Sequence, residues 1–244
     1  MIFSTRSLPA QFHYESHAFR PGETLTYKVK WGFLRLGTLV VKQEYADPDY
    51  PQYMQVWLNG ESANGLPFID VFFRSTALLD IAHPTSILYE LFSDREDRRR
   101  TAYVYDPTNK RLFALETMHG EIVRLDTLEA PMPYYDGLGL FMFARCTSGS
   151  DTTVMLPTVM DYDLSQTSIR FSNATEEIDV VAFDDPVQAF SFHGSTTWEG
   201  SSFGGMTGDF SGWVSTDSTR TVLKAAVEIF LGSVTIELEE RGTP

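Results

Sequence analysis

Strict alternation of apolar and polar side chains is the feature that most constrains how this 244-residue chain can fold. In the segment Glu23 to Trp31, the apolar residues Leu25, Tyr27, Val29 and Trp31 occupy every second position. A period of two places one set of side chains on each face of a β-strand, so the segment predicts a strand with one face in a core and the other in water.

Similar runs recur along the chain, with turn residues about every eight to twelve positions. Leu39 to Tyr45 resumes the first strand after Gly32 to Gly37, which predicts a hairpin. We interpret Gln166 to Ser172 and Ile178 to Phe183 as two separate strands, and the glycine- and serine-rich stretch from Gly200 to Gly212 as a hairpin loop. The predicted fold is all-β, an antiparallel barrel or half-barrel of roughly a dozen strands.

Only one segment, near residues 136–146, favours a short helix. Asp136 is a suitable N-cap, and the residues that follow are apolar on nearly every side, so this helix should be buried. No linker or repeat divides the chain. We therefore expect residues 1–19 to be an N-terminal extension, 20–240 a single barrel-like domain, and 241–244 a C-terminal tail.

Composition excludes several classes of partner. With 19 basic and 33 acidic side chains the formal net charge is -14, which argues against binding nucleic acid or an anionic membrane surface. The longest apolar run, Leu138 to Ala144, is far too short for a transmembrane helix, and the N-terminus does not resemble a secretory signal. The single cysteine, Cys146, excludes an internal disulfide and a multi-thiolate zinc site, and leaves the redox compartment open.

The possible catalytic and metal-binding patterns are weak. Ser202 lies in a G-x-S-x-G pattern, but more glycines follow it instead of the helix that a nucleophile elbow needs. His13 and His17 have helical spacing in a segment without helical periodicity, and the other histidines are scattered. Acidic pairs such as Asp161 and Asp163 lie in turn-like sequence, which fits a solvated turn better than a glycosidase pair or a calcium site. We expect no catalytic residue, no metal site and no cofactor.

Aromatic residues are the remaining candidates for a binding site. Tyr27, Trp31, Trp57, Trp198 and Trp213 each fall in a predicted strand and could line a pocket for an apolar ligand. Packing in a β core explains the same residues without a ligand, and we regard this as the simpler interpretation. The sequence sets no oligomeric state and does not show whether Cys146 is reactive.

Three separated stretches together resemble a bacterial family known as domain of unknown function 3108. The first is Gly22-Glu23-x-Leu25-x-Tyr27 with Trp31-Gly32 and Gly37, the second runs from Asp136 to Arg145, and the third is Trp213-x-Ser215-x-Asp217 with Arg220 and Gly232-Ser233-Val234. The proline that usually follows the final arginine is replaced by Thr221.

The resemblance implies an antiparallel, barrel-like fold in proteins that are mostly exported to the bacterial envelope, with no established activity and no catalytic residues. It therefore suggests a periplasmic or envelope location, while a cytoplasmic one stays open. Asp136, Arg145, Asp217 and Arg220 are candidates for helix caps or ion pairs as much as for ligand contacts.

Three functions remain on this basis. The first is a non-enzymatic envelope protein whose interior is either a packed core or a cavity for a lipid-like or other hydrophobic ligand. The second is a hydrolase acting on glycans or esters, and the third is an assembly or scaffold module with an exposed apolar patch.

Overall fold

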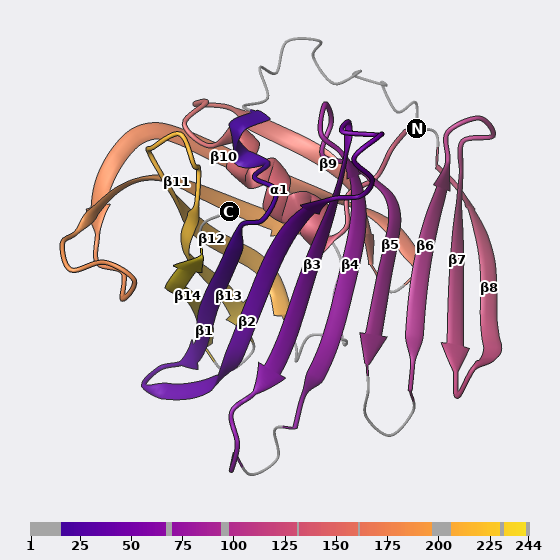
Figure 1. Ribbon diagram of the computed structural model, residues 1–244, viewed down its shortest axis with the longest axis horizontal. Coiled ribbons are helices and arrows are strands. Elements are labelled where there is room, and N and C mark those ends of the chain that lie inside the picture. Colours follow the sequence, from indigo (N-terminus) through magenta and orange to yellow (C-terminus); the bar gives the residue numbers. More distant parts are fainter. Residues whose placement is uncertain are drawn as a thin grey trace.

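The structure is a computed structural model that describes residues 16–66, 70–93, 98–130, 132–160, 162–196, 206–229 and 232–242. These residues form a single antiparallel sheet of 14 strands and one α-helix, which confirms the all-β prediction (Figure 1). The sheet is not closed, so the architecture is a half-barrel.

The chain builds the sheet as two meanders. A 3-10 turn, η1 (Ser16–Ala18), precedes the first meander, which contains β1 (Thr24–Trp31), β2 (Leu34–Tyr45), β3 (Tyr53–Ser62), β4 (Phe72–Asp80), β5 (Ser86–Ser93), β6 (Arg100–Asp106), β7 (Arg111–Met118) and β8 (Glu121–Glu129). The helix α1 (Gly137–Thr147) follows. The second meander contains β9 (Thr153–Met160), β10 (Asp163–Ile178), β11 (Val187–Thr196), β12 (Met206–Ser215), β13 (Val222–Ile229) and β14 (Gly232–Gly242).

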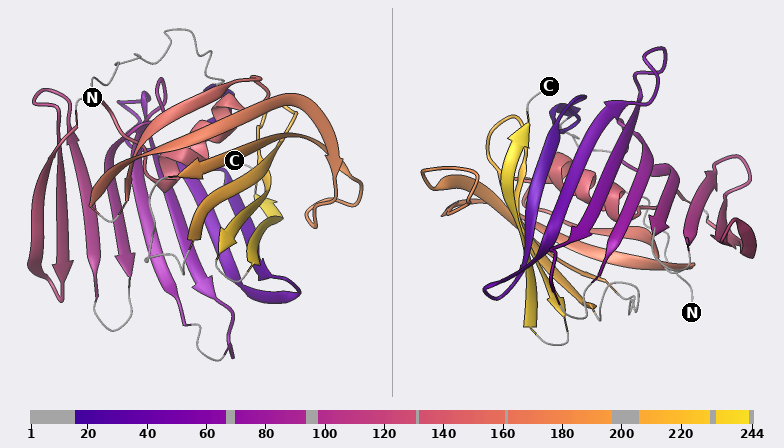
Figure 2. Two further views of the ribbon diagram at one scale, coloured as in Figure 1. Left: turned by 180° about the vertical axis from the view of Figure 1, so that it is seen from behind. Right: turned by 60° about the horizontal axis from the view of Figure 1, so that its bottom comes forward.

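The two meanders join through β1 and β14, which pair antiparallel in the middle of the sheet. The strand order is therefore β8 to β1 followed by β14 to β9, with β8 and β9 at the two edges. In Figure 2 the second meander curves across one face of the first, and α1 lies between them. The predicted hairpin from β1 to β2 forms, although β2 resumes at Leu34 instead of after Gly37.

The core fills the space around α1. Its buried side chains come from the helix and from both meanders, and they include Leu25, Met54, Met142, Phe143 and Leu223. Asp136 caps the helix as predicted, because its Oδ1 accepts hydrogen bonds from the backbone N–H groups of Leu138 and Gly139 at 2.8 and 2.9 Å. The helix is buried because both meanders pack against it.

A smaller cluster of aromatic residues connects the two edges of the open sheet. It combines Tyr103, Tyr105 and Leu112 from the first meander with Tyr134 and Val159 from the segment that includes β9. Tyr162, in the turn between β9 and β10, packs edge-on against Tyr103 with 6.0 Å between ring centroids. Side-chain packing therefore joins β8 and β9 across a gap that no strand pairing bridges among the described residues.

Two sequence predictions of secondary structure were wrong. The expected strand Ile178 to Phe183 does not form, because β10 continues through Ser172 to Ile178 with an irregular register and the chain then turns at 179–186. The Gly200 to Gly212 stretch is not all loop, since β12 begins at Met206 and includes Gly212. Position 212 in this strand requires glycine. A β-carbon there would lie only 2.3 Å from Cζ of the Phe192 ring.

Candidate functional site

Tyr27 is a core residue. It is 2% exposed, its ring packs edge-on against Phe141, and its hydroxyl donates a hydrogen bond to the carbonyl oxygen of Val222 at 3.0 Å. Burial raises the pKa of Tyr27 well above its usual value, so the phenol stays neutral. Tyr27 therefore connects β1 to β13 through this hydrogen bond and contacts the helix through Phe141.

Trp31 lies on the same face of β1 as Tyr27 and is the last residue of the strand. Exposure along this face rises from 0% at Leu25 to 39% at Trp31, with Val29 intermediate. Leu34 is the cross-strand partner of Trp31 in β2 and Val234 its partner in β14, and neither is buried. The inner face of the half-barrel is therefore covered around α1 and partly open at the Trp31 end.

Other strands show the same gradient of burial on the inner face. In β3 the buried Met54 and Val56 are followed by the half-buried Leu58, and in β4 the buried Leu79 contrasts with the half-buried Phe73. The strand β14, which pairs with β1, repeats it, because Leu238 is buried but Ile236 and Val234 are not. We refer to the partly exposed residues Val29, Trp31, Leu34, Leu58, Phe73, Val234 and Ile236 as the distal inner face.

Trp57 and Trp213 do not join this surface. Trp57 alternates with the buried Val56 along β3 and so points to the outer face of the sheet. Trp213, in β12, donates its indole N–H to Glu176 Oε1 at 2.8 Å. Trp198 lies outside the described residues. Of the predicted aromatic residues in the described part of the chain, only Trp31 and the more deeply buried Tyr27 therefore lie along the inner wall.

A buried ion pair holds the end of the half-barrel that is opposite Trp31. Arg145, at the end of α1, is fully buried and donates from Nη1 to Glu23 Oε2 at 2.7 Å. Gln43 donates to the same carboxylate oxygen at 2.7 Å. The other guanidinium nitrogens of Arg145 donate to the carbonyl oxygens of Arg220 at 2.8 Å and Thr219 at 2.9 Å. This one side chain thus connects the helix, β1 and the loop before β13.

Asp217 shapes the loop that Arg145 contacts. Its Oδ1 accepts hydrogen bonds from Ser215 Oγ and from the backbone N–H and hydroxyl of Thr219. Partial burial opposes ionisation of Asp217, but the hydrogen bonds from Thr219 and Ser215 outweigh it and lower its pKa. Glu23, Arg145 and Asp217 come from the three sequence stretches that carry the family resemblance, so those stretches meet at a structural contact.

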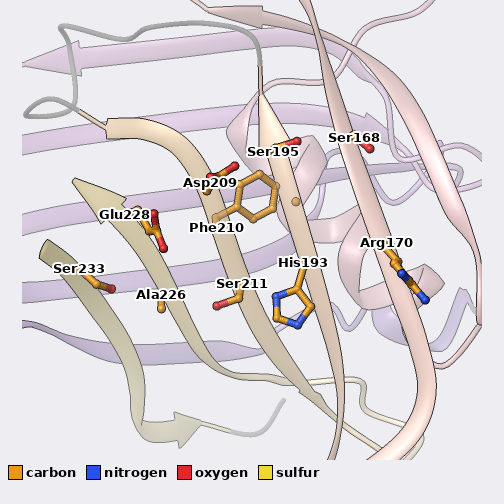
Figure 3. Close-up of a pocket in the computed structure, with 11 residues that line it drawn as sticks. Ser168, Arg170, His193, Ser195, Asp209, Phe210, Ser211, Ala226, Glu228 and Ser233 are labelled. Carbon is orange, nitrogen blue, oxygen red and sulfur yellow. The ribbon is translucent and has the colours of Figure 1, made fainter. Parts of the chain in front are cut away.

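The outer face of the second meander carries a groove of about 560 Å³ (Figure 3). Arg170 in β10 and His193 in β11 are direct cross-strand partners on one side of it. Asp209 in β12 and Glu228 in β13 line the other side, and serines from neighbouring strands lie between these charges. The groove can hold a polar group that carries both signs of charge. The side chains of Arg170, His193, Asp209 and Glu228 are all solvent-exposed.

The sequence alone did not predict this groove on the outer face of the second meander. Its residues occupy alternate outward positions, such as Ser168 and Arg170 in β10 and His193 and Ser195 in β11. The alternation of residues along each strand does indicate that these side chains point to the outer face. Only the pairing register, which the sequence did not supply, brings them side by side.

The other sequence candidates are dispersed or undescribed. Ser202 and His13 lie outside the described residues, as does Asp161, while His17 lies in η1. Three arginines follow one another at residues 98–100, and of these Arg99 pairs with Glu116 and Arg100 with Glu90. Across the described parts of the chain, no three His, Cys, Asp or Glu side chains gather closely enough to hold a metal ion. None of the helices in those parts has the length and hydrophobicity needed to cross a membrane.

The fold defines a class, the open antiparallel half-barrel wrapped around a single helix. A comparison with family models matches residues 26–239 to DUF3108, described as a protein of unknown function. The chain belongs to this family, as the sequence resemblance predicted. No curated protein matches it.

One of three matching solved structures supports the fold. A beta-barrel-like protein of domain of unknown function DUF1849 from Brucella abortus aligns with a TM-score of 0.60 at 8% identity, covering 91% of this chain and 97% of that one. A candidate exported protein with a YmcC-like fold from Bacteroides fragilis gives a TM-score of 0.42 at 11% identity, covering 92% and 99%. A candidate lipoprotein from Parabacteroides distasonis gives 0.36 at 10%, covering 92% and 98%. At sequence identities this low, the comparison informs only on the fold, and only through the Brucella abortus structure.

Proposed function

We propose that this protein is a non-enzymatic binding protein of the bacterial envelope that holds an apolar ligand against the distal inner face, with Trp31 at the entrance. The observation that carries the proposal is the gradient of burial along β1, from Leu25 at 0% to Trp31 at 39% exposed. When an apolar molecule covers partly exposed apolar side chains on a concave wall, the complex is stabilised by about 25 cal/mol per Å² of apolar surface removed from water.

The proposal assigns different roles to the two ends of the half-barrel. The ion pair of Arg145 and Glu23 fixes α1 at the closed end, where the core is complete. The distal inner face then accepts the ligand without displacing the helix. We also propose that residues 20–240 act as the binding domain, which is completed at its two ends by Ala18 and Phe19 in the core and by Arg241 and Gly242 in β14. The envelope location rests on the family resemblance and remains a prediction.

Binding of the neutral fluorophore N-phenyl-1-naphthylamine tests this function. The purified protein should increase and blue-shift the probe's fluorescence, and Trp31→Ala should weaken the affinity about tenfold, since losing roughly 1.4 kcal/mol of apolar contact corresponds to that factor. Trp57→Ala is the matched control, because Trp57 points to the outer face, and it should leave the affinity unchanged. Equal effects of both substitutions, or no binding of the probe, would contradict the proposal. Native mass spectrometry after mild purification should also retain an apolar adduct.

The hydrolase hypothesis ranks lower on the same geometry. Asp209 and Glu228 are both exposed in the outer groove, whereas the general acid of a glycosidase needs an environment that keeps it protonated near neutral pH. The ester version depends on Ser202, which lies outside the described residues.

A docking role for assembly is a second candidate because apolar residues are exposed at one edge of the sheet. Val104, Phe113 and Leu125 lie on the outer face of β6 to β8, and Leu125 is on the edge strand. If this surface docks a partner, a photo-cross-linking side chain at position 125 should give one discrete adduct in cells. The same group at the exposed Asp184 should give none.

A further inference from the structure

The hairpin tip between β1 and β2 has an unusual surface. Phe33 is fully exposed, and Trp31 and Leu34 on either side of the turn are 39% and 38% exposed. Gly32 precedes Phe33 with a φ of 57°, a conformation that glycine adopts readily, so the turn is tight and presents Phe33 at its outermost point. Figure 1 shows this turn at the lower end of the sheet, where β1 and β2 meet. Three adjacent apolar side chains thus project together from one tip.

From this surface we propose that the β1–β2 tip is a membrane-docking element, which inserts Phe33, Trp31 and Leu34 into the interface of a lipid bilayer. The inference rests on the proposed function, because Trp31 belongs both to the tip and to the distal inner face. Docking at this tip would bring the opening of the half-barrel against the lipid, so that an apolar ligand could pass between them without crossing water.

The chemistry of the tip fits a bilayer interface. An indole combines a large apolar ring with an N–H donor and is favoured at the level of the lipid headgroups, while Phe and Leu side chains suit the acyl boundary. Behind the tip, Lys30 pairs with Glu237 at 2.8 Å and Arg35 with Glu239 at 2.7 Å. The cations at the base of the tip are thereby neutralised, so the tip attracts lipid through apolar contact and not through charge.

The charge of the whole chain specifies the kind of bilayer. A net charge of -14 repels anionic lipid at low ionic strength. We therefore expect the tip to bind a bilayer of zwitterionic lipids. Anionic lipid should weaken this binding, and added salt should restore it.

Flotation with phosphatidylcholine vesicles tests the proposal. The protein should float with these vesicles, and adding 30% phosphatidylglycerol should reduce the bound fraction at low salt. Phe33→Asp should lower the apparent vesicle affinity at least tenfold, because it places a charge where an apolar ring inserts. Tyr50→Asp is the matched control, since Tyr50 is 55% exposed in the turn after the other end of β2. It should bind vesicles like the unmodified protein.

Quenching by brominated phosphatidylcholine locates the contact. It should reduce tryptophan fluorescence in the unmodified protein and in Trp57→Phe, and much less in Trp31→Phe, if Trp31 enters the bilayer. Failure to float, or equal loss of flotation in Phe33→Asp and Tyr50→Asp, would overturn the proposal. So would sedimentation showing that Phe33→Asp turns a dimer into a monomer without changing vesicle binding, because the tip would then be occupied by a second copy.

The two proposals fail separately. The Phe33→Asp variant should still bind N-phenyl-1-naphthylamine in solution, since Phe33 lies in the turn and not on the distal inner face. Probe binding without vesicle binding would remove the docking role and leave the proposed function intact. Vesicle binding without probe binding would remove the proposed function.

Discussion

At the scale of single residues, the most consequential side chain is Arg145, whose guanidinium is fully buried. A buried charge is tolerated only when its partners replace water, and Arg145 has one carboxylate and two carbonyl oxygens within 2.9 Å. The residues that make the family recognisable in this sequence therefore mark an energetic requirement of the fold.

Replacing Arg145 should be severe. Arg145→Met leaves the Glu23 carboxylate buried without its main partner and should lower the free energy of unfolding by about 3–5 kcal/mol. Urea denaturation followed by circular dichroism measures this change, with the exposed Arg111→Met expected to stay within about 0.5 kcal/mol of the unmodified protein. In the double variant Glu23→Gln/Arg145→Met the loss should be smaller than the sum of the two single losses. Strict additivity would contradict the pairing.

Asp136 should make stability depend on pH. Burial raises its pKa to about 6, although hydrogen bonds from the backbone N–H groups of Gly139 and Leu138 oppose the shift. Because the folded state holds this proton more tightly than the unfolded chain, this contribution to the free energy of unfolding falls as pH rises from about 4 to 6, by about 3 kcal/mol in total.

Asp136→Asn isolates that contribution. Asparagine caps helices as well as aspartate and carries no charge, so the variant should be more stable than the unmodified protein at pH 7.5. The advantage should shrink toward pH 4.5 in thermal unfolding measured at both pH values. An advantage that grows as pH falls would show that the sign is wrong.

At the scale of elements, the second meander depends on aromatic rings lying over glycines of the neighbouring strand. Phe192 covers Gly212 and Phe210 covers Gly194, each as a direct cross-strand pair. Phe192 also packs against Phe171 and Phe210, with centroid distances of 5.8 and 6.4 Å, which leaves its ring little freedom to move. These contacts set how closely β11 and β12 can approach each other.

A methyl group at Gly212 should therefore disturb the sheet. Gly212→Ala places a β-carbon 2.3 Å from the ring of Phe192 and should reduce the free energy of unfolding by about 1–3 kcal/mol. Gly137→Ala is a suitable comparison, because nothing lies within 4 Å of its β-carbon position in the first turn of α1. That substitution should leave stability unchanged or raise it by up to about 1 kcal/mol. Equal chemical denaturation midpoints for the two variants would contradict this account.

Local patterns predicted the elements well where one face is buried and the other wet. The alternation of Leu25 and Tyr27 identified β1, and Asp136 identified the start of α1. Prediction failed at β10, because Ser172-Asn173-Ala174 resembles a turn but is an irregularity within one strand, which pairs with β11 up to Phe171 and again from Thr175. The outer groove was unpredictable for a related reason. Register is set by contacts between strands, and no single strand encodes it.

At the scale of the whole molecule, the open edges depend on the aromatic cluster that includes Tyr162. Its backbone has a φ of 68°, which is unfavourable for a bulky residue, and its hydroxyl lies 3.2 Å from that of Thr101. Arg124 lies 4.0 Å from the ring centroid, and burial raises the pKa of Tyr162 to about 12. The turn between β9 and β10 is thereby fastened to the inner side of β6 and β8.

Removing this ring should loosen one side of the half-barrel only. In Tyr162→Ala, amide hydrogen exchange should become at least tenfold faster in β6 to β8 and remain unchanged in β11 to β13, since Tyr162 contacts Tyr103 and Thr101 of β6 and Arg124 of β8. Tyr50→Ala, in an exposed turn, should change neither region. Uniformly faster exchange would instead mean that the substitution destabilises the entire sheet.

The seam between β1 and β14 has a consequence for biosynthesis. Thr24 pairs with Gly242, so the sheet is completed when the first of its described strands pairs with the last. Until β14 emerges, β1 and β13 each present an unpaired edge, which is a template for association with other chains. Translation delivers residues at only about 5–20 per second, so a nascent chain keeps these edges open for many seconds. Chaperone capture during synthesis should therefore matter more for this fold than for a sheet whose meander closes in order.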